Sequence, residues 1–148
     1  MTPNEMTQLA VDATKSLIDV LNAESEALSK SQVARVEQLL ETKQTAAEVF
    51  ESRIKDISER PDILAQTTPA IRQDLRSAKE RLDTAALQNA HALRAAMELN
   101  NRLVQRIAQS VERQRITAAG YTNTGGAYAR PAASNHGDIL PVSLDESL

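Results

Sequence analysis

Apolar and small side chains recur at steps of three and four residues between Leu9 and Ile57. This spacing is the period of an α-helix, whereas a strand would alternate every second residue. No glycine or proline interrupts residues 4–60. The pattern therefore predicts one helix over about residues 3–60, which ends before Pro61 because proline cannot continue a helix.

Both expected helices start with the same signal. Thr2 precedes Pro3, and Glu5 lies three residues after the threonine. Threonine caps a first turn, proline is tolerated at the first helical position, and a glutamate at this distance completes a capping box. Thr68 and Pro69 repeat the threonine–proline pair and predict a second start.

The second helical pattern runs from Ile71 to Val111. The pattern ends near residues 118–119, and the following Gly120 is a candidate left-handed C-cap. We therefore expect a second helix over about residues 69–118.

Two long helices joined by about ten residues are expected to run antiparallel. A turn centred near residue 64 places Ala46 opposite Leu82 and Leu21 opposite Ile107. The predicted fold class is all-α: a long antiparallel helical hairpin with coiled-coil-like packing. The connection has room for a short third helix.

The last part of the chain has a different composition. Residues 120–148 hold all four glycines and both tyrosines. We interpret residues 1–119 as the helical hairpin and residues 120–148 as a flexible tail.

The apolar stripe is wider than a pair of helices requires, since a two-stranded coiled coil needs only its a and d positions. Surplus exposed apolar surface often marks an interaction site. The tail, a second copy or a helix of another protein could each cover it, and the pattern does not choose between them. The candidate residues for binding a partner helix are Leu17, Ile18, Leu21, Leu103, Val104 and Ile107.

Polar residues interrupt the expected seam between the helices. Asn89 and Asn100 fall in it, and the first apolar line is broken at Glu24, Ser31, Arg35 and Lys43. The asparagines suit hydrogen bonds that fix the register of a coiled coil. They equally suit ordinary polar positions in an imperfect coil.

Charge and composition exclude several classes of function. The chain has 17 basic and 20 acidic side chains, interspersed, with a net charge of −3 and 2% aromatic residues. It lacks a basic stripe with interleaved aromatics, so nucleic-acid binding is not expected. It also lacks cysteine, a signal-peptide pattern and an apolar run long enough to span a membrane. We expect a soluble cytoplasmic protein without membrane insertion.

The sequence offers no constellation for catalysis. His91 and His136 have no metal-ligand spacing, and the glycine-rich nucleotide-binding motifs are missing. We therefore expect no catalytic residues, no metal, no cofactor and no enzymatic activity.

Four short motifs, in this order, carry a resemblance to a known family and cover about residues 7–126. The motifs are Leu21-x-x-Glu24-Ser25-x-Ala27-Leu28, Leu39-Leu40-x-x-Lys43, Asn100-Asn101-x-Leu103-Val104 and Tyr121-Thr122-Asn123-Thr124-Gly125. In their order and spacing they resemble the FlgN family of flagellar export chaperones.

The resemblance implies a function and two partners. The family binds hook–filament junction proteins of the FlgK and FlgL type, prevents their premature assembly, and delivers them to the export gate protein FlhA. It also implies that Tyr121 and Gly125 dock on the gate. The extension after Gly126 is longer than the family pattern requires.

Two alternatives stay open at this stage. One is a structural or scaffold coiled coil, and the other is an export chaperone of the FliT type. A scaffold is expected to self-associate strongly, whereas a chaperone is expected to be a monomer or a weak homodimer.

Overall fold

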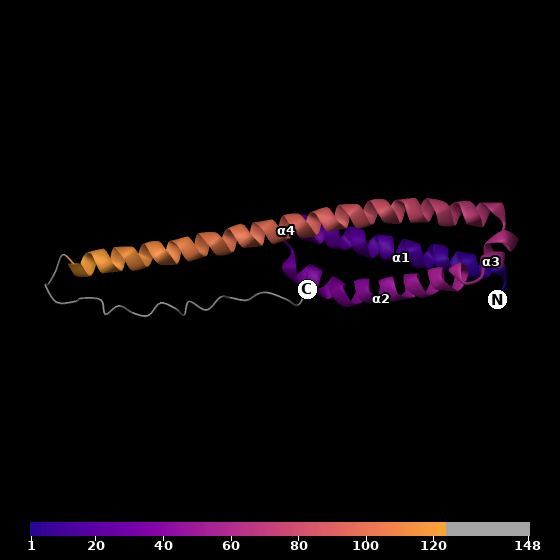
Figure 1. Ribbon diagram of the computed structural model, residues 1–148, viewed down its shortest axis with the longest axis horizontal. Helices are drawn as coiled ribbons and strands as arrows, with labels where there is room; N and C mark the ends of the chain where they lie inside the picture. The colour runs from indigo at the N-terminus through magenta and orange to yellow at the C-terminus, as the bar shows by residue number, and fades with distance from the viewer. Residues whose placement is uncertain (124–148) are drawn as a thin grey trace. The chain divides into compact units, whose positions relative to one another are not determined.

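The computed structural model describes the backbone of residues 1–123 and the side chains of residues 1–120. These residues form four helices, α1 (Pro3–Ser29), α2 (Val33–Ser58), α3 (Pro61–Gln66) and α4 (Pro69–Asn123), and no strand (Figure 1). The predicted all-α class is confirmed. The chain divides into two units, residues 1–103 and residues 104–148, and each is described by itself.

In the first unit, three helices pack side by side, with α2 antiparallel to both α1 and α4 (Figure 1). Lys43 in the middle of α2 binds Asn89 of α4, with 3.3 Å between Nζ and Oδ1. The same asparagine side chain donates to Ser25 Oγ of α1 at 3.3 Å. α2 and α4 thus form the antiparallel hairpin that the pattern predicted, and α1 packs against both.

The prediction of one uninterrupted helix over residues 3–60 is wrong. The chain leaves the helical path at Lys30–Gln32, and Ser31 has a left-handed backbone with φ of 55°. The Gln32 N–H donates to Ala27 O at 2.9 Å, and the Ser31 N–H donates to Leu28 O at 3.1 Å. This pair of bonds is a Schellman motif, which usually takes glycine at the left-handed position.

Replacing Ser31 with glycine is expected to stabilise the fold by about 0.5–1 kcal/mol, since the left-handed conformation strains every residue with a Cβ. Urea denaturation should show a higher midpoint for Ser31→Gly. The matched control is Ser16→Gly, at an exposed position inside α1, which should lose about 0.5 kcal/mol. Equal losses in both variants would contradict the strained turn.

The turn at Ser31 changes the expected partners of the first helix. Leu21 was expected opposite Ile107, but it is buried in a cluster with Leu82 and Ala85 of α4. Ala46 of α2 packs against the same cluster, so its predicted proximity to Leu82 is confirmed. Because α2 folds back along α1, α1 runs parallel to α4 instead of antiparallel to it.

Hydrogen bonds close the end of the first unit where α3 meets α4. The buried hydroxyls of Thr7 and Thr67 lie 2.8 Å apart, and the Thr67 hydroxyl donates to Ile63 O at 2.7 Å. The Thr68 N–H donates to Asn4 Oδ1 at 2.9 Å. The first turns of α1 are thereby joined to the start of α4, more than 60 positions later in the chain.

The predicted capping box at the start of α1 is confirmed. The Thr2 N–H donates to Glu5 Oε2 at 2.7 Å, and the Glu5 N–H donates to Thr2 Oγ1 at 3.2 Å. The pKa of the Glu5 carboxyl is held below its usual range. The main cause is the hydrogen bond from the Thr2 backbone, and the second is the hydrogen bond with the Thr2 side chain.

The predicted end of the second helix is also corrected. α4 continues through Gly120 to Asn123, and no described glycine has a positive φ. Gly120 is therefore a helical residue instead of the left-handed C-cap. Glycine costs about 1 kcal/mol inside a helix but does not prevent one. The expected flexible tail lies mostly outside the described residues.

Candidate interaction surfaces

Half of the expected partner-binding residues are core residues. Leu17, Ile18 and Leu21 are only 7%, 2% and 7% exposed, and they pack in the cluster with Leu82 and Ala85. They are buried because α2 folds back over them after the turn at Ser31. The prediction that these three side chains form a partner-binding surface is therefore wrong.

The other half is exposed. Leu103 belongs to the first unit and is 55% exposed, while Val104 and Ile107 belong to the second and are 51% and 56% exposed. Within the first unit, exposed Leu103 is not part of the buried cluster that contains Leu17, Ile18 and Leu21.

In the second unit, α4 carries an exposed apolar line that we call the α4 stripe, made of Val104, Ile107 and Val111. These residues share one face of the helix because they are spaced by three and four positions. Val111 is 51% exposed, and every residue from 104 to 120 is exposed. No described side chain therefore covers the α4 stripe.

In the first unit, an apolar groove of about 260 Å³ lies where the turn between α1 and α2 meets α4. Val33 and Leu99 are 68% and 60% exposed in it, so they are available for contact. Asn100, one of the two seam asparagines, lies here instead of in the buried interface. We call this surface the tip groove, and it is lined by Leu28, Ser31, Gln32, Val33, Val36, Ala96, Leu99, Asn100 and Leu103.

A buried polar cluster connects the three long helices of the first unit. Glu24 of α1 is 3% exposed, and its Oε2 atom accepts from Lys43 Nζ and from Asn89 Nδ2, each at 2.7 Å. Asn89 is 4% exposed and also lies within hydrogen-bonding distance of Leu21 O. No buried side-chain polar atom in the described residues lacks a partner. The cluster is satisfied internally, so we assign it to the packing of the helices.

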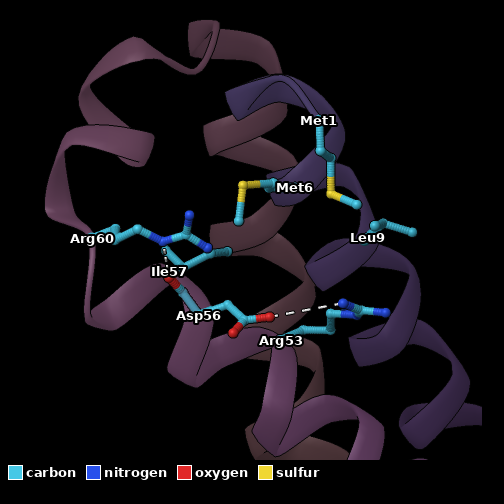
Figure 2. A pocket seen from close by; sticks show the side chains of 7 residues that line it. All are labelled: Met1, Met6, Leu9, Arg53, Asp56, Ile57 and Arg60. Carbon is cyan, nitrogen blue, oxygen red and sulfur yellow. Dashed lines mark hydrogen bonds and ion pairs between the residues drawn. The ribbon is translucent and has the colours of Figure 1, made fainter.

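The hollow between the start of α1 and the end of α2 offers no reactive group (Figure 2). Its volume is about 380 Å³. Arg53 Nη1 lies 3.8 Å from Asp56 Oδ2, and Arg60 Nε donates to the Asp56 carbonyl at 3.4 Å. Met1, Met6, Leu9 and Ile57 supply the rest of the wall. The charged groups contact one another, and none is a nucleophile with an adjacent base.

The remaining candidate sites of the sequence lie partly outside the described residues. Tyr121 falls within α4, but its side chain and the whole of Gly125 lie outside the described part. Residues 1–123 contain no group of three His, Cys, Asp or Glu side chains placed to hold a metal ion. No helix in this part of the chain is long and apolar enough to cross a membrane.

Sequence reasoning missed the tip groove and the buried polar cluster. The groove exists only because the chain reverses at Ser31, and no glycine or proline marks that reversal. The cluster had a visible signal, since Glu24, Lys43 and Asn89 interrupt apolar lines on three segments. Buried polar side chains need hydrogen-bonding partners, so a carboxylate, an ammonium and an amide at apolar positions can be proposed to contact one another before a structure is known.

Comparison of the chain with protein-family models, curated proteins and solved structures found no match.

Proposed function

We propose that the protein is a flagellar export chaperone that holds an amphipathic helix of its client on the α4 stripe. The observation that carries the proposal is the exposure of Val104, Ile107 and Val111 on one face of a helix without a described partner. Aliphatic side chains at this spacing form an apolar face through which one helix can pack against another. Exposing them is unfavourable unless a partner covers them for part of the time.

The resemblance of the sequence to the FlgN family supplies the identity of the client. We propose that it is a hook–filament junction protein of the FlgK or FlgL type, bound in the cytoplasm. Binding would shield the client's terminal helices from premature assembly until delivery to the export gate protein FlhA. Tyr121 and Gly125 remain our candidates for docking on the gate.

The test is the double substitution Val104→Asp with Ile107→Asp. Burying one aliphatic side chain contributes about 1.5–3 kcal/mol, so losing two contacts should weaken client binding at least about tenfold. Because both positions are exposed, helicity should be retained. Binding is measured by isothermal titration calorimetry against purified FlgK-type and FlgL-type proteins.

The matched control is Gln109→Asp, at an exposed position on the opposite side of the same helix. It introduces a comparable charge without touching the stripe, and client affinity should stay unchanged. Equal affinity of the double variant and the control would refute the stripe as the client site. Binding of neither client to the unmodified protein would refute the chaperone function itself.

A scaffold is the second candidate, because the spacing of Val104, Ile107 and Val111 also matches consecutive a and d positions of a coiled coil. A scaffold should form stable oligomers through this helix at low micromolar concentration. Sedimentation velocity separates the two functions, since the chaperone is expected to sediment as a monomer or weak homodimer.

A further inference from the structure

The α4 stripe lies in a segment whose charge is opposite to that of the whole chain. Residues 104–120 contain three arginines and one glutamate, a net charge of +2, whereas the whole chain has a net charge of −3. Arg115 lies four positions after Val111 and so borders the stripe. Among the described residues, none of the arginines in this segment forms an ion pair. An occupant with acidic groups beside its apolar side chains would fit this surface.

The chain contains such a segment outside the described residues. Its sequence from 138 to 146 is Asp-Ile-Leu-Pro-Val-Ser-Leu-Asp-Glu. Four aliphatic side chains are thus bracketed by three carboxylates, which complement the aliphatic stripe and Arg115 beside it. A second copy fits less well, because each copy of the segment 104–120 has a net charge of +2 and two such segments would repel each other.

The connecting chain is long enough for this contact. From Val104 to Asn123 the helix measures about 28 Å at 1.5 Å per residue. Residues 124–137 can span up to about 46 Å when extended. Residues 138–146 can therefore reach the whole of the stripe.

We propose that residues 138–146 of the same chain cover the α4 stripe. This proposal rests on the proposed function and extends it. If residues 138–146 cover the stripe, a client must displace them before it can bind there. Tethering gives an effective concentration of about 1 mM. If the isolated segment binds with a Kd of about 0.1 mM, removing it should raise client affinity about tenfold.

Cysteine pairs test the contact without any client, and the natural chain contains no cysteine. Ser143→Cys is combined in the full chain with Gln114→Cys, which lies seven positions after Ile107 on the stripe face. The matched control combines Ser143→Cys with Gln109→Cys on the opposite face. Both glutamines are exposed. Under mild oxidation, the Gln114 pair should form an intramolecular disulfide at least about fivefold faster than the Gln109 pair.

Adding Leu140→Asp and Val142→Asp should abolish that preference, because the apolar part of the contact is lost. Equal rates for the two original pairs would overturn the proposal. A product that is mainly a disulfide between two molecules would also overturn it and assign the stripe to a second copy.

Titration of a FlgK-type client separates this proposal from the proposed function. The variant carrying Leu140→Asp and Val142→Asp, without cysteines, should bind the client about tenfold more tightly than the natural chain. If the disulfide forms preferentially on the stripe face but no client binds, the contact of residues 138–146 is supported and the chaperone function is refuted. If client binding depends on Val104 and Ile107 but the two disulfides form at equal rates, the chaperone function is supported and the contact is refuted.

Discussion

Ile18→Asp is expected to unfold the first unit. Ile18 is 2% exposed and packs between α1, α2 and α4. Truncating a buried isoleucine costs about 2–5 kcal/mol, and leaving a carboxylate in its place adds the cost of burying a charge. A small domain has only about 5–15 kcal/mol of stability, so most of it would be lost. Far-UV circular dichroism and thermal melting would measure the loss.

Ile107→Asp is the matched control for this substitution. It makes the same chemical change at a helical isoleucine that the sequence had assigned to the same surface. Because Ile107 is 56% exposed, the expected change in stability is within about 0.5 kcal/mol. Similar melting temperatures for the two variants would contradict the packing of α1 in the core.

Lys43→Ala is expected to destabilise the first unit by about 3 kcal/mol. The substitution leaves the Glu24 carboxylate buried without its cationic partner, and removing one member of a buried ion pair is strongly destabilising. The Lys43 side chain is 27% exposed, so water relieves part of the cost. Urea denaturation gives the free energy of unfolding.

The exposed pair of Lys79 and Asp83 provides the control for Lys43→Ala. Their charged atoms lie 3.1 Å apart, but both side chains are largely exposed. Lys79→Ala should therefore cost less than about 0.5 kcal/mol. A joint replacement, Glu24→Leu with Lys43→Met, should recover more than half of the loss, because no unpaired charge stays buried. Equal losses of unfolding free energy for Lys43→Ala and Lys79→Ala would show that the buried pair contributes no more to stability than the exposed pair.

The helices could be predicted from the sequence wherever a local signal exists. Thr2 with Glu5 marked the start of α1, and Pro61 marked the region where α2 ends. These features depend on residues near one another in the chain, so short-range patterns contain them.

The reversal at Ser31 could not be predicted in the same way. A serine in the left-handed region costs only about 1–2 kcal/mol, which the packing of α2 against α1 can offset. Polar residues interrupt the apolar line at Ser31 and Arg35, but Glu24 and Lys43 interrupt it equally inside α1 and α2, so these interruptions do not distinguish a turn from a straight helix. One undetected turn then reversed the direction of α1 relative to α4, and with it the expected exposure of Leu17, Ile18 and Leu21.

The hydrogen bonds that join Thr7 to Thr67 and Asn4 to Thr68 also order the events of folding. α1 and α2 can pair once residue 58 has left the ribosome, since their contacts are local in sequence. The hydroxyl of Thr7 acquires its partner only after α3 has left the ribosome. During translation, the first turns of α1 therefore emerge before α2 and α3 but form these hydrogen bonds late, after a stretch of chain longer than α1 and α2 together.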